Sequence, residues 1–202
     1  MLTGNRPVML LAGLNFSINL VFATALSVNA AVITGVFEAP ESSFALLNMC
    51  VGITGLANLL IAPLLLRRFD VWALGAFGFV LLCAALLMLG AAPSFAFYAP
   101  AYVAALAGVA YFNVFNRTQR VKVIPEEHLG KVMGPFYLLN LLSYPLGGLL
   151  VAGFAVMLGP QRLIGLCAIG LCAIGAVLMP LTVRSFRRAL AAGEPVAVSA
   201  RA

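Results

Sequence analysis

The sequence predicts an all-α, polytopic membrane protein that crosses the bilayer with six transmembrane helices. Its 202 residues are 63% hydrophobic and 9% charged, with a mean hydropathy of +1.09. Soluble domains are about 45 to 50% apolar and about 25% charged, so this composition excludes an ordinary soluble fold. The charged residues all lie in short polar breaks between long apolar runs. Because a spanning helix needs about 20 apolar residues, the length accommodates roughly six helices and no separate soluble domain.

The first three spans are predicted from apolar runs that contain no charge. The run at residues 8–36 follows Arg6 and is longer than the core of a signal peptide. Such a core has about 7 to 15 residues, so we expect a retained and tilted helix. The polar sequence EAPESS separates this helix from the second span at 44–66. The short break RRFD then leads to the third span at 71–90.

The last three spans are predicted at residues 95–116, 133–158 and 163–183. The turn AAPS precedes the first of these spans, and GPQR precedes the last. Between the fourth and fifth spans lies the longest break, at residues 117–132, which contains both basic and acidic side chains. We expect residues 1–183 to form the bundle and residues 184–202 to form a flexible, basic, cytoplasmic tail.

The long break divides the predicted bundle into two units of three helices. Three is an odd number of crossings, so consecutive units have opposite orientations in the membrane. This is the arrangement of an inverted-topology repeat, which is common in secondary transporters. Small residues four positions apart, such as Ala104 and Gly108 or Gly148 and Ala152, are expected to let neighbouring helices pack closely in lipid.

The basic residues predict the orientation of the chain. With six spans both termini lie on one side, and all of the 12 Lys and Arg residues except Arg162 fall on that side. The positive-inside rule places this side in the cytoplasm, so the N- and C-termini are expected inside the cell. The net charge of +6 is interpreted as an orientation signal that also attracts membrane lipids, and no nucleic-acid partner is expected.

Several functional classes lack the residues that they require. The nucleotide-binding pattern G-x-x-x-x-G-K-[ST] is absent, and so are the motifs of intramembrane enzymes and of channels. No Asp, Glu, His, Lys or Arg lies within a predicted span, so the chain offers no mid-membrane proton relay. The four cysteines lack metal-ligand spacing and are interpreted as packing residues. We therefore predict neither enzyme activity nor a metal or cofactor.

Uncharged polar residues follow one face of several spans. At about 100° per residue, the asparagines of the first span fall within an arc of about 80°, and the tyrosines and asparagines of the fourth within about 60°. Either these groups hydrogen-bond neighbouring helices, or the first and fourth spans line a shared water-filled cavity; the length of both stripes favours the cavity. The candidate substrate-binding residues are Asn15, Asn19, Asn29, Tyr98, Tyr102, Asn113 and Asn140.

The most specific stretch of the sequence begins at Arg120. It reads VKVIPEEHLGKVMG from Val121 to Gly134 and continues as LLNLLSYPLGGLLVAGF from Leu138 to Phe154. This stretch resembles the junction between helices ten and eleven of the major facilitator superfamily, most of all its branch of bacterial siderophore and macrolide exporters. The resemblance covers all six predicted spans. It implies the C-terminal half of a twelve-helix transporter in a bacterial inner membrane.

The charged residues of the inner breaks are candidates for a gate. Glu126 or Glu127 can pair with Arg117, Arg120 or an arginine of a partner and so hold the inner side closed. Between the second and third spans, members of the superfamily often keep Gly, then Asp-Arg and Gly-Arg-Arg, whereas this chain has IAPLLLRRFD and retains a smaller charge cluster. The candidate gating residues are Arg67, Arg68, Asp70, Arg117, Arg120, Glu126, Glu127 and Lys131.

The resemblance implies a function in transmembrane transport. We expect the chain to supply half of an alternating-access efflux pathway for a small-molecule substrate, together with a second six-helix bundle, either an N-terminal half or another copy. Neutral amides and phenols favour a moderately hydrophobic organic compound. The alternative is a six-helix scaffold or a transporter remnant that moves nothing, because one bundle supplies only one side of such a pathway.

Overall fold

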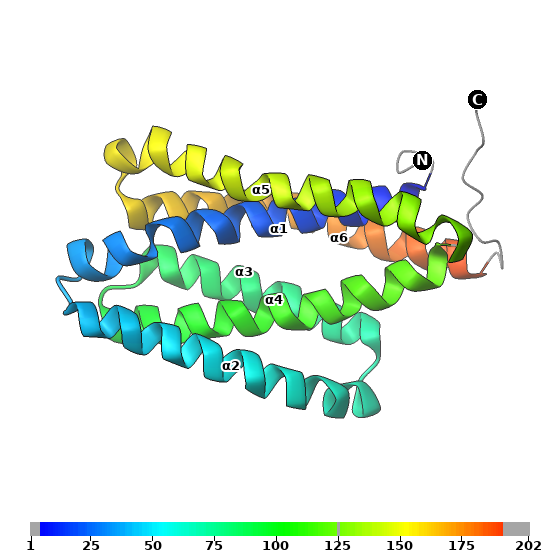
Figure 1. The fold of residues 1–202 in the computed structure, drawn as a ribbon, viewed down its shortest axis with the longest axis horizontal. Helices are drawn as coiled ribbons and strands as arrows, with labels where there is room; N and C mark the ends of the chain where they lie inside the picture. The colour runs from blue at the N-terminus through cyan, green and yellow to red at the C-terminus, as the bar shows by residue number, and fades with distance from the viewer. Residues whose placement is uncertain (1–4, 125, 192–202) are drawn as a thin grey trace.

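The computed structural model describes residues 5–124 and 126–191. These residues form six long helices, roughly parallel or antiparallel to one another (Figure 1). The elements are α1 (Arg6–Ala30), the short π-helix η2 (Ala31–Val36), α2 (Glu41–Arg68), α3 (Val71–Ala91), α4 (Phe95–Val123), the 3₁₀ turn η3 (Glu126–His128), α5 (Leu129–Leu158) and α6 (Pro160–Ala191).

Each of the six long helices has the length and apolar composition needed to cross a membrane. The first crossing combines α1 with η2, and the described part of the chain contains no strand. The all-α class and the six spans predicted from the sequence are therefore confirmed, and the architecture is that of a multi-pass helical membrane protein. The assignment to half of a major facilitator fold is a finer statement, which we treat below as a proposal.

The helices extend beyond the predicted spans at the end of the bundle that carries the basic residues. α4 continues to Val123 and α5 starts at Leu129, so the break predicted at residues 117–132 contains only a short connection. α6 continues to Ala191, and the first part of the predicted flexible tail is therefore helical, while residues 192–202 lie outside the described residues. Basic residues are favourable in the last turn of a helix, because its carbonyl end carries partial negative charge.

Local signals account for the ends of several helices. The side chain of Asn5 accepts a hydrogen bond from the backbone N–H of Val8 at 3.2 Å, which caps the start of α1. Pro40 immediately precedes α2, where a missing N–H costs no helical hydrogen bond. Gly159 ends α5 with φ of 81°, a conformation that glycine adopts without strain, and Glu38 reaches a φ of 51° in the turn before α2.

The first helix of each three-helix unit packs mainly against helices of the other unit, an arrangement that we call the exchange of partners. α1 packs mainly against α5 and α6, which belong to the second unit, whereas α4 packs mainly against α2 and α3, which belong to the first. α3 and α6 also pack against each other, and α2 and α5 lie at opposite edges of the bundle with broad exposed faces (Figure 1). α1 and α4 therefore each pack chiefly against helices of the other unit.

Glycines permit close contact between α3 and α4. A Cβ added at Gly108 would lie 2.6 Å from the backbone N of Leu82 and 2.8 Å from the carbonyl O of Gly78. The expectation that small residues bring helices together therefore holds at Gly108. It fails at Gly148, where an added Cβ would meet nothing within 4 Å. The four-residue spacing is the same at both positions, so spacing alone does not identify a contact.

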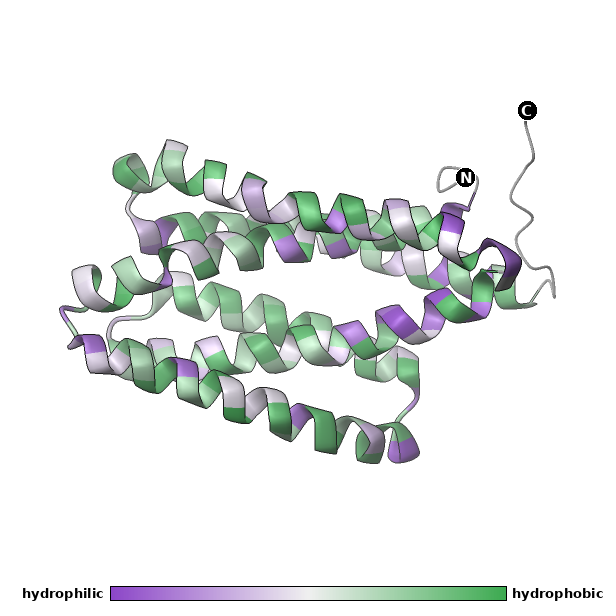
Figure 2. Ribbon diagram, in the orientation of Figure 1, coloured by the Kyte–Doolittle hydropathy of each residue, from purple (hydrophilic) through white to green (hydrophobic). Residues whose placement is uncertain are grey.

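The basic residues gather at one end of the bundle. α1 begins and α6 ends at this end, and the hydrophilic colour in Figure 2 is concentrated on the helix ends there. Arg162 follows the start of α6 at the opposite end. We call the basic end the inner end and the opposite end the outer end, following the orientation predicted from the sequence.

Candidate functional site

Four asparagines form a hydrogen-bonded cluster between α1, α4 and α5. The Asn140 side-chain carbonyl accepts hydrogen bonds from the amides of Asn15 at 2.6 Å and Asn19 at 3.3 Å. The Asn116 amide donates to the Asn15 side-chain carbonyl at 2.7 Å. Asn15, Asn116 and Asn140 are buried, and Asn19 is half-buried. We call these four residues the asparagine cluster.

The sequence periodicity explains how the cluster forms. Asn15 and Asn19 lie one helical turn apart on α1, so both side chains reach the same acceptor. The Asn140 amide donates to the carbonyl of Phe136 at 2.7 Å, and the hydroxyl of Ser143 donates to the carbonyl of Asn140 at 2.5 Å. Polar groups inside a bilayer must find partners within the protein, and these hydrogen bonds join three helices, while the buried side-chain carbonyl of Asn116 has no partner among the described residues.

A second polar contact joins α1 and α4 nearer the outer end. The Tyr98 hydroxyl donates to the Asn29 side-chain carbonyl at 3.0 Å. The Tyr98 ring stacks against Tyr102 with 6.1 Å between centroids, and Tyr102 also contacts Phe22 at 6.3 Å. Tyr98 is fully buried and Tyr102 is 2% exposed. These two tyrosines therefore lie inside the bundle, between helices.

Most of the predicted substrate-binding residues thus contact other helices in this structure. Their contacts correspond to the first of the two alternatives drawn from the sequence, in which polar stripes hold helices together. Asn113 is different: it is half-buried and lines a groove between α2 and α4. The residues that the structure places in helix interfaces are Asn15, Asn19, Asn29, Tyr98, Tyr102 and Asn140.

The groove that contains Asn113 has a volume of about 480 Å³. Its other polar lining groups are Asn58 of α2 and Tyr111 and Arg117 of α4. Asn58 is 8% exposed and Asn113 is half-buried, and both amides line the groove. Arg117 is exposed and lies towards the inner end. We call this part of the seam the inner groove.

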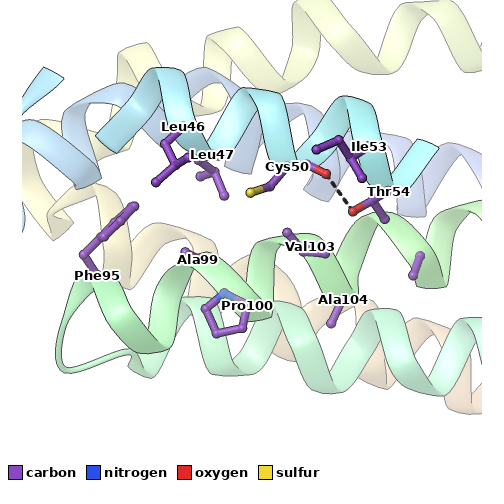
Figure 3. A pocket seen from close by; sticks show the side chains of 11 residues that line it. Leu46, Leu47, Cys50, Ile53, Thr54, Phe95, Ala99, Pro100, Val103 and Ala104 are labelled. Atoms are coloured by element: carbon purple, nitrogen blue, oxygen red, sulfur yellow. Dashed lines mark hydrogen bonds between the residues drawn. The ribbon is translucent and has the colours of Figure 1, made fainter. Parts of the chain in front are cut away.

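A second groove follows the same two helices towards the outer end (Figure 3). It has a volume of about 570 Å³, and almost all of its lining atoms are carbon. Its only side-chain hydroxyl is that of Thr54, which donates to the carbonyl of Cys50 in its own helix at 2.7 Å. We call it the outer groove. It is lined by Leu46, Leu47, Cys50, Ile53 and Thr54 of α2 and by Phe95, Ala99, Pro100, Val103, Ala104 and Ala107 of α4.

Arg120 is buried beside the start of α5. Its guanidinium carbon lies 4.0 Å from the centre of the Phe136 ring and 5.4 Å from that of Tyr137, and its Nε donates to the carbonyl of Asn116 at 3.3 Å. The side chain is 3% exposed. Stacking on an aromatic face offsets part of the cost of removing the cation from water, so Arg120 connects the inner ends of α4 and α5.

The predicted ion pair between Arg120 and Glu127 is not formed in this structure. Glu127 is exposed and instead lies 3.7 Å from His128, the one ion pair among the described residues. The side chain of Glu126 lies outside the described residues. The other candidate gating residues are exposed at the inner end without an ion-pair partner in the described parts of the chain: Arg67, Arg68, Asp70, Arg117 and Lys131.

Three features of this region do not follow from the sequence interpretation. Asn116 is part of the polar stripe of the fourth span but is not among the candidate residues, although it bonds Asn15. Asn58 shares its span with Asn48, and its only signal is an amide five residues before Pro63 in a mostly apolar run. The burial of Arg120 is indicated in the sequence only weakly, by the adjacent aromatic residues Phe136 and Tyr137 on which it stacks.

Comparisons with known proteins identify no relative of the chain. No protein-family model matches it, and neither does a curated protein or a solved structure. Within the described residues, no group of His, Cys, Asp and Glu side chains is arranged to hold a metal ion. Functional inference therefore depends on the bundle, its polar interfaces and the grooves between α2 and α4.

Proposed function

We propose that the chain is one half of a membrane transporter that moves a small organic solute by alternating access, as the resemblance to major facilitator exporters implies. In this proposal the substrate leaves the cell, and a second six-helix bundle supplies the other wall of the pathway. That bundle is an N-terminal half or another copy of the chain. The membrane is a bacterial inner membrane, with both termini in the cytoplasm.

The observation that carries the proposal is the exchange of partners between the two three-helix units. α1 packs against α5 and α6, while α4 packs against α2 and α3. Two units of three helices with opposite orientations and corresponding packing partners are the building plan of many secondary transporters, whose repeats move against each other around a shared site. A scaffold does not require that α1 and α4 have corresponding packing partners.

The polar contacts between α1, α4 and α5 are compatible with movement. Side-chain hydrogen bonds between membrane helices contribute on average about 0.6 kcal/mol each. The few bonds of the asparagine cluster and the Tyr98–Asn29 pair therefore define one closed arrangement without making it irreversible. When the helices separate, these amides could form hydrogen bonds with water or solute in place of one another, as an alternating-access pathway requires.

The second candidate is a six-helix scaffold that transports nothing. It is favoured by the burial of Asn15, Asn29, Tyr98 and Asn140, which seals most of the predicted substrate-binding face between helices. A scaffold would keep these contacts permanently. A transporter would break them in part of its cycle.

The test compares cells that naturally express this chain with cells in which its gene is disrupted. The readout is the intracellular level of a panel of moderately hydrophobic organic dyes, with the gene restored as a control. We expect disruption to raise the level of at least one dye and restoration to return it to normal. Unchanged levels across the panel, with the chain present in normal amounts in the parent cells, would support the scaffold instead.

A further inference from the structure

The seam between α2 and α4 changes in polarity along its length. The outer groove is apolar, whereas the inner groove contains the amides of Asn58 and Asn113 and ends at Arg117. The two grooves follow each other directly, because Thr54 lines the outer one and its neighbour Gly55 lines the inner one. Towards the inner end, the seam therefore offers first carbon, then uncharged hydrogen-bonding groups, and finally a cation.

We propose that this seam binds a monoacyl phospholipid with a net negative headgroup. Its acyl chain lies in the outer groove, its glycerol linker lies at Asn58 and Asn113, and its phosphate lies at Arg117. As a binding site the seam can be tested by itself. As the substrate class of the transporter it rests on the proposed function.

The size of the outer groove selects one acyl chain. Its volume is about 570 Å³. At roughly 30 Å³ per methylene, close to the volume share of a water molecule, this space holds one chain of about 16 to 20 carbons. A second chain of that length would have to lie outside the groove. The half-buried methyl groups of Val103 and Ala104 and the ring of Pro100 provide apolar contacts on the α4 side (Figure 3).

The two amides match the glycerol linker. Asn58 is 8% exposed, and its amide lines the inner groove together with that of Asn113. Neither amide is among the buried side-chain groups that lack a partner, so both reach the surface of the groove, where they can form hydrogen bonds with the hydroxyl and ester carbonyl of a ligand. Pro63 adds an acceptor, since it has no N–H to donate to the carbonyl of Leu59, another lining residue.

Arg117 matches the phosphate. It lies one turn beyond Asn113 on α4, which is about 6 Å at 1.5 Å per residue. Its position near the inner end suits the depth of a lipid phosphate, and a long arginine side chain reaches the interface while its methylenes stay in the groove. A guanidinium binds phosphate through two parallel hydrogen bonds. No Asp or Glu is among the lining residues of either groove.

The binding experiment uses the purified chain in a neutral maltoside detergent and native mass spectrometry. The probes are palmitoyl lysophosphatidylglycerol and palmitoyl lysophosphatidylcholine, which share the chain and the glycerol linker but differ in net charge. We expect the anionic lipid to bind more tightly. Arg117→Gln should weaken its binding about tenfold, the value of one charge-assisted hydrogen bond, and change that of the neutral lipid less than twofold.

Two further variants test the contribution of the outer groove and the specificity of the effect at Arg117. Ala104→Trp fills the outer groove and should weaken the binding of both lysolipids. Arg188→Gln is the matched control: Arg188 is an exposed arginine at the inner end of α6 and lines neither groove, so its loss should change neither affinity. Helix content and thermal stability, measured on every variant, verify that each one is folded.

Several results would overturn the proposal. Equal affinity for the two lysolipids, unchanged by Arg117→Gln, would identify ordinary boundary lipid. Palmitic acid binding as tightly as the anionic lysolipid would show that the linker is not recognised, and dipalmitoyl phosphatidylglycerol binding as tightly would show that the seam does not select one chain. Binding is measured without transport, so the two proposals can fail independently. A failed dye-export test would not contradict the lipid site, and a failed binding test would not contradict the export of other solutes.

Discussion

Asn140 is the residue on which the asparagine cluster converges. Its side-chain carbonyl accepts from both Asn15 and Asn19 of α1. We predict that Asn140→Leu lowers the free energy of unfolding by about 1 to 2 kcal/mol, because it removes the hydrogen bonds between helices and leaves the buried Asn15 amide without an acceptor. The measurement is reversible unfolding in mixed detergent micelles.

The matched control for this prediction is Asn48→Leu. Asn48 is exposed on α2, and its amide donates only to the carbonyl of Phe44 in its own helix at 3.0 Å. This variant should change the free energy of unfolding by less than about 0.5 kcal/mol, as surface substitutions usually do. A similar loss in both variants would mean that the asparagine cluster contributes nothing specific to stability.

Arg120 and Phe136 form a pair whose coupling can be measured. The ring lies 4.0 Å from the guanidinium carbon, in a buried place where cation–π attraction is strong. We predict a coupling energy of about 1 to 2 kcal/mol in a double-mutant cycle of Arg120→Gln and Phe136→Leu, measured by unfolding. The cycle of Arg117→Gln with Phe136→Leu should be additive. Additivity in both cycles would exclude the stacking as a stabilising contact.

The polar stripe of α1 shows how far helical periodicity predicts a site. The stripe on α1 places Asn15 and Asn19 on one face, and the two side chains do share an acceptor. Whether that face meets water or another helix depends on the position of α5, which no pattern within α1 encodes. Asn113 and Asn116 are about 60° apart around the helix, yet one faces the groove and the other faces α1. The sequence gives no basis for choosing between them.

At the scale of helices, Gly108 determines how closely α3 and α4 approach. We predict that Gly108→Ala lowers the free energy of unfolding by about 1 to 3 kcal/mol, because the new methyl group would overlap the backbone of α3 at Leu82 and Gly78. Gly148→Ala serves as the control, since an added Cβ there meets nothing. Alanine is the better helix former by about 1 kcal/mol, so the control should be neutral or slightly stabilising. Equal effects of the same sign at the two sites, measured by unfolding, would contradict this contact.

Hydropathy predicts the presence of all six helices but not where they end. The predicted fourth span stops at residue 116, before the first charge, whereas α4 continues to Val123. In this added stretch Gln119 and Arg120 are buried, while Arg117 and Lys122 are exposed. The helix has become amphipathic there, and an average over hydropathy treats such a stretch as polar. On its buried side Arg120 stacks on Phe136 of α5, a contact that a hydropathy average does not include.

At the scale of the whole molecule, the order of the six crossings follows from the sequence, but the partners of each helix do not. The odd number of helices per unit predicts opposite orientations of the two units. The exchange of partners between them requires knowledge of helix surfaces in three dimensions. Gly78 and Gly108 show why: the spacing of Ala104 and Gly108 predicts a close contact at Gly108 but does not predict that its partner is Gly78 of α3.

The orientation of the bundle is directly testable. We predict that a cysteine at position 41 reacts with a membrane-impermeant maleimide added outside intact cells, and that a cysteine at position 128 reacts only after the membrane is opened. Position 41 starts α2 at the outer end, and position 128 lies between α4 and α5 at the inner end. The four native cysteines are first replaced by alanine. The reverse labelling pattern would contradict the orientation inferred from the basic residues.

The transport proposal predicts different outcomes for two residues of the predicted cavity face. Asn19→Leu should reduce dye export severalfold while sparing the abundance of the chain, since Asn19 is half-buried and its 3.3 Å bond to Asn140 is the longer of the two. Tyr102→Ala should lower abundance as well as export, because it removes a ring that is 2% exposed and packed against Tyr98 and Phe22. Tyr102→Phe keeps the ring, so normal abundance with reduced export would assign a transport role to the hydroxyl itself. Export and abundance falling in parallel in Asn19→Leu would instead make Asn19 a structural contact and favour the scaffold.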